Sequence, residues 1–246
     1  MNFSYTVGET TFDNVDDWKS SLLPSYDEFS KLPSRQKKLL EWLRAYEKSN
    51  IRILDYGAGI GAFGWWISRK LDSVKVVNYD QDFTSNLIGK ECFTRENCIH
   101  TLDSESLSSS EKFEVVMALE LIEHIPDLAI FLTEIKDYMH EDGMLIISTP
   151  NAFGFQSIKE EFFRRVNSVI RRRNNNGYVS MINSVPYDPV THLGHLNLFS
   201  PRTLFTLLKS QGFEVVKFMN IPQSNSILHR FFPETLAVMA RRISVE

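Results

Sequence analysis

The sequence has few cysteines, no long apolar run and no excess of positive charge, and each shortage excludes a class of protein. Its 246 residues include two cysteines, Cys92 and Cys98, whose spacing fits neither a disulfide framework nor the paired cysteines of a structural zinc site. No apolar stretch approaches the roughly 20 residues that a helix needs to cross a bilayer. We therefore expect a protein of a reducing, cytoplasmic compartment that at most lies on a membrane surface.

The charge balance argues against a general affinity for nucleic acid. There are 27 Lys and Arg against 31 Asp and Glu, so the formal net charge is −4. Contact with a polyanion would have to be local. A composition of 43% hydrophobic and 24% charged residues is that of an ordinary globular protein, and it excludes intrinsic disorder, collagen and coiled coil as descriptions of the whole chain.

Short strand-like and helix-like segments alternate along the middle of the chain. We expect strands, because the segments are short and rich in Val, Ile and Leu, at 51–56, 74–79, 113–119 and 144–148. Amphipathic or apolar helical patterns occupy 35–48, 62–71, 83–90 and 128–139. A helix beginning near Pro201 and two further strands, 212–220 and 235–243, complete the pattern. This order predicts an α/β fold with a doubly wound sheet, whose ligands bind beyond the carboxyl ends of the strands.

Two segments fall outside this alternation. Residues 1–34 form an aromatic-rich leader that we expect to pack as a lid on one domain spanning 35–246. That domain contains an insertion, 151–197, which is far longer than an ordinary strand-to-helix loop. Within it, residues 155–173 carry six Lys and Arg against two Glu and predict a basic amphipathic helix. Such a helix can cover its own active site, which we favour, or make peripheral contact with an anionic membrane, or bind RNA.

The strongest motif is a glycine-rich turn after the strand at 51–56. Glycines without a Cβ let a ligand lie directly on the backbone, and the helix that follows offers free N–H groups to an anion. Part of the turn also spells G-x-G-x-x-G, the dinucleotide fingerprint, so NAD is an alternative ligand. Asp55, two residues before the first glycine, repels a pyrophosphate and suits the cationic S-adenosylmethionine. We expect that cofactor to be bound by Asp55, Gly57, Ala58, Gly59 and Gly61.

Further candidate cofactor ligands follow the next strands. Asp80, nineteen residues after Gly61, is placed to accept hydrogen bonds from both hydroxyls of a ribose, with Gln81 beside it. Leu102 and Asp103 could supply an apolar contact and an acceptor for the adenine amino group, although an ordinary turn explains them almost as well.

One more stretch, A-L-E-L-I-E-H-I-P-D at 118–127, follows the strand at 113–119. With the D-x-G-x-G-x-G turn and the acid after the second strand, it makes the chain resemble the class I S-adenosylmethionine-dependent methyltransferases over roughly residues 35–150. The resemblance implies a Rossmann-like sheet of seven strands with an antiparallel C-terminal pair, and a cofactor contact at Leu119. The E-x-x-E-H part resembles two branches, the ubiquinone-type O-methyltransferases and the small-RNA 3′-terminal 2′-O-methyltransferases.

The resemblance to these two branches also implies a divalent metal beside the acceptor hydroxyl. Its ligands would be Glu120, Glu123, His124 and His195, with His192 as a substitute, and Mg²⁺, Mn²⁺ or Fe²⁺ would suit them. We expect Glu123 and His124 to be catalytic, since a base or a metal there would expose the acceptor oxygen. The alternative is structural: Glu123 and His124 would orient the next helix, and the later histidines would pack the insertion.

These observations predict a methyltransferase that acts on a hydroxyl of a small-molecule, sugar or lipid-linked acceptor. The choice of oxygen comes from the resemblance, while the net charge of −4 and the aromatic leader favour a small acceptor over RNA. RNA 2′-O-methylation, an NAD-dependent reductase and a binding protein without catalysis are the alternatives. The identity of the acceptor and the oligomeric state are not encoded in any pattern of the sequence.

Overall fold

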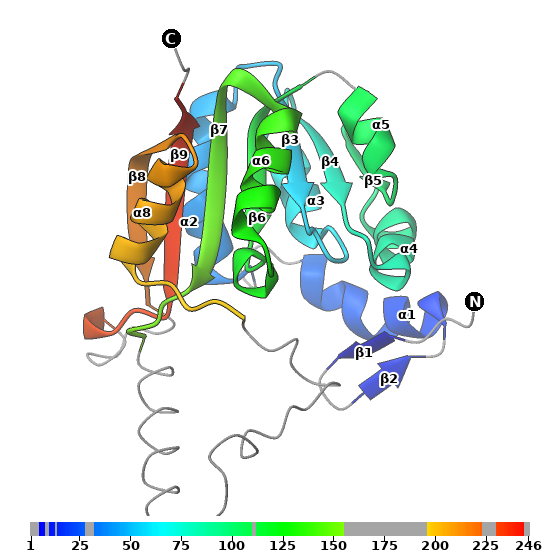
Figure 1. Cartoon of the computed structure of the whole chain (residues 1–246). Helices are drawn as coiled ribbons and strands as arrows, with labels where there is room; N and C mark the ends of the chain where they lie inside the picture. The colour runs from blue at the N-terminus through cyan, green and yellow to red at the C-terminus, as the bar shows by residue number, and fades with distance from the viewer. Residues whose placement is uncertain are drawn as a thin grey trace, which may run out of the picture.

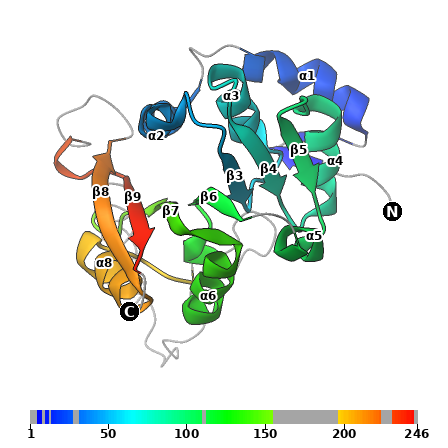
Figure 2. The same cartoon turned by 90° about the horizontal axis from the view of Figure 1, so that it is seen from above.

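The computed structural model describes residues 5–7, 10–12, 14–27, 32–109, 112–154, 196–222 and 230–243. Their centre is a seven-stranded sheet with helices on both faces (Figures 1 and 2). The strand order is β5-β4-β3-β6-β7-β9-β8, and β9 runs antiparallel to both of its neighbours. The first five strands in that order are parallel, so their carboxyl ends lie along one edge. The Rossmann-like fold with an antiparallel C-terminal pair is confirmed.

The strands of this sheet are β3 (Arg52–Tyr56), β4 (Lys75–Tyr79), β5 (Cys98–Thr101), β6 (Phe113–Leu119), β7 (Met139–Pro150), β8 (Phe213–Ile221) and β9 (Thr235–Arg242). The helices are α2 (Ser34–Leu43) with the short 3-10 helix η2 (Arg44–Tyr46), α3 (Ala62–Lys70), α4 (Phe83–Cys92), α5 (Ser104–Ser109), the 3-10 helix η3 (Ile122–His124), α6 (Leu128–Tyr138) and α8 (Pro201–Ser210).

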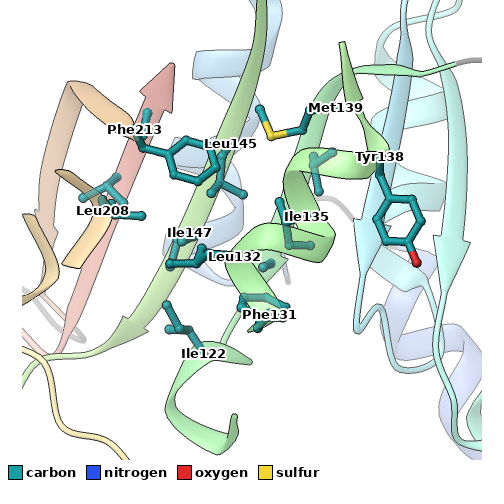
Figure 3. Close-up of a cluster of buried hydrophobic side chains, with 14 of the residues drawn as sticks. Ile122, Phe131, Leu132, Ile135, Tyr138, Met139, Leu145, Ile147, Leu208 and Phe213 are labelled. Atoms are coloured by element: carbon teal, nitrogen blue, oxygen red, sulfur yellow. The ribbon is translucent and has the colours of Figure 1, made fainter. Parts of the chain in front are cut away.

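Alternate side chains of each central strand enter two different cores. Leu54 of β3 and Leu145 of β7 belong to the core under α6 and α8, whereas Ile53 of β3 and Ile146 of β7 belong to the core under α2 and α3. Figure 3 shows Leu132 and Ile135 of α6 in the first core, near Leu145 and Ile147 of the sheet. Successive side chains of a strand point to opposite faces, so strands that are apolar throughout are buried on both sides.

The described part of the leader forms a hairpin, β1 (Tyr5–Val7) and β2 (Thr10–Phe12), and a helix, α1 (Val15–Asp27). Trp18 of α1 is completely buried and its ring meets that of Phe93, directly after α4, edge to face at 6.0 Å. This contact anchors α1 beside the β4–β5 half of the sheet (Figure 2). A lid function for residues 1–34 stays a prediction. The expected helix at 155–173, His192 and His195 lie outside the described residues.

Candidate active site

The glycine turn follows β3 at the carboxyl edge of the sheet. Gly57, Gly59 and Gly61 have φ values of 77°, 56° and 70°, a left-handed region that disfavours residues with a Cβ. The backbone N–H groups of Gly57 and Ala58 donate to the carbonyl of Tyr79, at 2.8 and 3.0 Å, which fixes the turn on β4. A Cβ added to Gly59 would meet no atom within 4 Å. The turn therefore presents open space in which a ligand can lie on the backbone.

Tight packing explains why positions 61 and 64 are glycines. A Cβ on Gly61 would lie 2.1 Å from Cε1 of His100, and a Cβ on Gly64 would lie 2.0 Å from Oδ1 of Asn78. Both distances are far below a van der Waals contact, so His100 and Asn78 exclude any side chain at these two positions. Gly61 and Gly64 thus have a packing reason that does not involve a dinucleotide, although together with Gly59 they spell the dinucleotide fingerprint.

Two predicted cofactor ligands, Asp55 and Asp80, lie close to this turn. Asp80 accepts a hydrogen bond from the Gly59 N–H through Oδ2, at 2.6 Å, and from the Asp82 N–H through Oδ1, at 2.8 Å. Asp55 is buried, and burial together with the negative charge of Asp80 raises the pKa of its carboxyl from 3.8 to about 7. A cationic group bound beside the turn would favour the ionised form of Asp55, as expected for the sulfonium and ammonium groups of S-adenosylmethionine.

A cavity of about 290 Å³ adjoins the turn. Gly57, Asp80 and Gln81 line it together with residues of the segment from Leu121 to α6. Leu102 and Asp103 are not among its lining residues, and Asp103 uses Oδ1 to accept the N–H of Glu105 at the start of α5. The structure thus brings Asp80 and Gln81 to the cavity, while the adenine contact of Leu102 and Asp103 stays a prediction.

Leu119 ends β6, and Glu120 follows it in an unusual conformation. Glu120 has a φ of 52°, and it is the one non-glycine residue with positive φ in the part of the chain that the structure describes. Its N–H donates to the carbonyl of Ser148 at 2.8 Å, and the Ser148 hydroxyl donates to Oε1 at 2.8 Å. Nη1 of Arg35 lies 3.0 Å from Oε2. A strained backbone held by several partners is typical of functional sites.

Glu123 and His124 are consecutive residues of η3. Glu123 is 1% exposed, and its Oε2 accepts the hydroxyl of Thr149 at 3.0 Å. Burial is the main cause that raises the pKa of this carboxyl from 4.5 to about 7, and the charge of Glu120 adds to the rise. His124 places Nε2 4.0 Å from Oε1 of Glu123 and keeps 26% of its side chain exposed. Neither residue lines the cavity, but the pair lies at the same carboxyl edge, with a buried carboxylate beside a partly exposed imidazole.

The described residues do not fit a metal centre by themselves. Both carboxylate oxygens of Glu120 are engaged by Ser148 and Arg35, and one oxygen of Glu123 is engaged by Thr149. Within the described ranges, no group of three or more His, Cys, Asp or Glu side chains could hold a metal ion. The fourth predicted ligand, His195, lies outside those ranges.

Arg35 is the residue of this site that the sequence analysis missed. It belongs to the charged face of α2, and its partner Glu120 is far away in sequence. A lone arginine on an amphipathic helix carries no signal of such a contact. The structure shows that it places a guanidinium at the carboxyl edge of the sheet, where it neutralises Glu120.

Comparisons with known proteins agree with this geometry. A family model described as a methyltransferase domain matches residues 28–217. Ubiquinone biosynthesis O-methyltransferases of Rickettsia felis and Bartonella tribocorum are 29% and 27% identical over 125 and 124 residues. These alignments cover 48% and 47% of this chain and 50% and 49% of the relatives. The chain thus spans about half the length of the curated relatives it matches.

Solved structures resemble the chain over a larger part of its length. A magnesium protoporphyrin IX methyltransferase from Synechocystis PCC 6803, with bound S-adenosylhomocysteine, has a TM-score of 0.56 at 13% identity and covers 93% of this chain and 97% of its own. The 1,6-didemethyltoxoflavin-N1-methyltransferase of Burkholderia thailandensis, also with S-adenosylhomocysteine, has a TM-score of 0.56 at 14% identity and covers 98% and 100%. At these identities the likeness concerns the fold.

Proposed function

This chain belongs to the methyltransferase-domain family and is a class I S-adenosylmethionine-dependent methyltransferase, and from that premise we propose that it methylates a hydroxyl oxygen of a small-molecule acceptor. The observation that carries the choice of a hydroxyl is the pair of Glu123 and His124 at the carboxyl edge of the sheet, one buried and one partly exposed. A hydroxyl must lose its proton to become a good nucleophile, and this pair can accept it. The ubiquinone biosynthesis O-methyltransferases among the relatives support the same choice.

The chain's main contribution to the reaction is alignment. S-adenosylmethionine supplies a methyl group already activated by the positive charge on its sulfur. Asp80 would hold the ribose hydroxyls, the Gly57–Gly61 turn would carry the ligand on its backbone, and Asp55 would favour the cationic end. Holding the acceptor oxygen in line with the bond that breaks can contribute about 7–11 kcal/mol.

The acceptor proton would pass to the Glu123–His124 pair, in which Nε2 of His124 and Oε1 of Glu123 lie 4.0 Å apart, so that the carboxylate charge would stabilise a protonated imidazole. Arg35 and Ser148 would keep Glu120 paired, so that its charge does not oppose deprotonation of Glu123 further. A metal bound by Glu120 would compete with Arg35 for Oε2.

A lipid-linked acceptor is supported by apolar side chains at the same edge. Phe153, Leu198 and Phe231 are 62%, 62% and 76% exposed. The segments that carry them are joined by hydrogen bonds of Asn151 to Glu234 and of Ala152 to Phe199. These hydrogen bonds place the segments where β7 ends and β9 begins; Figure 1 shows these ends of the two strands side by side. Among the helices of the described ranges, none has the length and apolarity needed to cross a membrane.

A transfer assay tests the proposal. The protein is incubated with methyl-labelled S-adenosylmethionine and, in separate reactions, a catechol-type phenol, the same phenol with a polyprenyl chain, a sugar and a short RNA. We expect an O-methylated phenol by mass spectrometry, and loss of turnover in His124→Ala with unchanged affinity for S-adenosylhomocysteine. Methylation of nitrogen, or of the RNA alone, would refute the proposed acceptor class.

The same assay decides the metal hypothesis. If Glu120, Glu123, His124 and His195 bind a divalent ion, EDTA abolishes turnover and Mg²⁺, Mn²⁺ or Fe²⁺ restores it. Full activity of a chelator-treated sample would instead leave Glu120 as the partner of Arg35. Cofactor affinity, measured in parallel, should not respond to EDTA in either case.

A further inference from the structure

The cavity beside the glycine turn extends to a carboxylate that the proposed reaction does not use. Glu134 of α6 lines the cavity together with Asp80 and Gln81. Its Oε1 accepts two hydrogen bonds, from the hydroxyl of Tyr56 at 2.9 Å and from that of Tyr138 at 2.8 Å. In the part of the chain that the structure describes, hydrogen bonds to this carboxylate reach Oε1 alone. Two tyrosines therefore fix the side chain and leave Oε2 available for a ligand.

Aromatic rings form the wall between Glu134 and the cofactor turn. The rings of Tyr56 and Tyr79 are 4.8 Å apart, and that of Phe131 lies 5.9 Å from Tyr56. Tyr56, Tyr79 and Phe131 all line the cavity, and Leu121 and Ile125 add apolar surface. Flat rings beside one fixed acceptor suit a flat heteroaromatic ligand that carries an amino group.

We propose that Glu134 recognises the adenine of S-adenosylmethionine by accepting a hydrogen bond from its exocyclic amino group. Asp80, Tyr79 and Glu134 all line this cavity; the Tyr79 ring is 4.8 Å from that of Tyr56, whose hydroxyl donates to Glu134. A ribose held by Asp80 would therefore place its base in the cavity that these rings and Glu134 line. Glu134 is thus a specificity-determining residue for the cofactor, and the assignment holds whichever acceptor is methylated.

The sequence pointed to a different residue for this contact. Asp103 follows β5, but the structure uses its Oδ1 to accept the N–H of Glu105 at 2.9 Å, and Asp103 does not line the cavity. Glu134 lies in the middle of α6, where a glutamate is an ordinary helix residue. Its role becomes visible through Tyr56 and Tyr138, which reach it from β3 and from the end of α6.

Two ligands that differ at one position test the proposal by calorimetry. S-adenosylhomocysteine carries the 6-amino group, and S-inosylhomocysteine carries a 6-oxo group that cannot donate to a carboxylate. Wild-type protein should bind the first at least about tenfold more tightly, because a hydrogen bond to a charged group is lost with the second. In Glu134→Gln the ratio should fall to about one or reverse, since the amide can donate to a 6-oxo group. The glutamine oxygen still accepts from both tyrosines.

A control variant and three overturning results define how the ligand preference tests the proposal. Asp137→Asn, an exposed acid on the same helix, should keep the wild-type ratio. A ratio that is unchanged in Glu134→Gln, with or without a general loss of affinity, overturns the proposal. So does wild-type protein that binds both ligands equally, or an Asp103→Asn variant that alone removes the preference. Thermal denaturation checks folding, and Glu134→Asp replaces the glutamine variant if that one does not fold.

Discussion

Gly59 and Gly61 of the glycine turn are glycines for different reasons, which substitutions can distinguish. Gly59 faces open space, so Gly59→Val should fold at a cost of about 1–2 kcal/mol for the left-handed backbone and should abolish binding of S-adenosylhomocysteine. Gly61→Val should prevent folding, because its Cβ would meet His100 at 2.1 Å. Calorimetry and thermal denaturation measure both. A folded Gly59→Val variant with wild-type affinity would place the cofactor elsewhere.

Asp80 and Asp82 form a second matched pair. Asp80 accepts from the Gly59 N–H and faces the cavity, whereas Asp82 accepts from the Ser85 N–H at 2.7 Å and caps α4. Asp80→Ala should weaken S-adenosylhomocysteine binding by about 1.5–3 kcal/mol, the contribution of hydrogen bonds to a charged group. Asp82→Ala should cost about 1 kcal/mol of stability with little change in affinity. Equal affinities for Asp80→Ala and wild type would remove Asp80 from the ribose site.

The raised pKa of Glu123 predicts how stability depends on pH. Its folded-state pKa of about 7 exceeds the ordinary 4.5, so the folded protein binds more protons than the unfolded chain between these values. The free energy of unfolding should therefore fall as the pH rises through this range. Glu123→Gln should make the fall shallower but not remove it, because Asp55 shifts in the same direction. Urea titrations across this range measure it, and identical slopes for both proteins would contradict the assignment.

At the scale of elements, the sequence predicts the strands that are rich in Val, Ile and Leu and misses a short edge strand and a short helix. The expected strands at 51–56, 74–79, 113–119 and 144–148 correspond to β3, β4, β6 and β7, whose buried residues are mostly apolar on both faces. β5 was missed because it is an edge strand of four residues, in which Ile99 is half exposed and His100 is buried. α5, with six residues, is too short to show a helical period.

For the site, too, the sequence predicts contacts that follow from the order of the strands and misses contacts between side chains of distant segments. Asp80 and Gly59 meet because parallel strands end at one edge, which the order of elements already implies. The contacts of Arg35 with Glu120 and of Tyr56 with Glu134 join distant segments through side chains whose identities are unremarkable in their own helices or strands. No periodicity or spacing in the sequence encodes such contacts.

The packing of α1 gives a prediction at this scale. Trp18 is completely buried against Phe93, and the rest of the described leader has few comparable anchors. Trp18→Ala should cost about 3–5 kcal/mol in the docking of α1, the range for deleting a large buried ring. Hydrogen exchange should show lost protection of α1, while Lys19→Ala, an exposed neighbour, should leave it unchanged. Unchanged protection in Trp18→Ala would mean that other contacts hold the leader.

At the scale of the whole molecule, one edge of the sheet gathers the cofactor turn, the Glu123–His124 pair and the exposed apolar side chains of Phe153, Leu198 and Phe231. A lipid surface that meets this edge would bring a lipid-linked hydroxyl to the site. Burying a phenylalanine or leucine contributes about 1.5–3 kcal/mol, and each basic residue near an anionic membrane adds about 1 kcal/mol that falls with salt. The basic segment 155–173 would supply the second contribution.

Two variants separate these contributions on anionic vesicles. Replacing Phe153, Leu198 and Phe231 with Ser should abolish sedimentation with vesicles and lower turnover of the polyprenyl phenol, but spare the short phenol. Replacing Arg171, Arg172 and Arg173 with Gln should remove the salt-sensitive part of binding. Ile99→Ser, which changes an exposed apolar residue on the distant β5, should bind as wild type does. If wild-type protein does not bind vesicles, or if the serine variant turns over both phenols equally well, the exposed side chains do not serve a membrane. The acceptor would then reach His124 from solution.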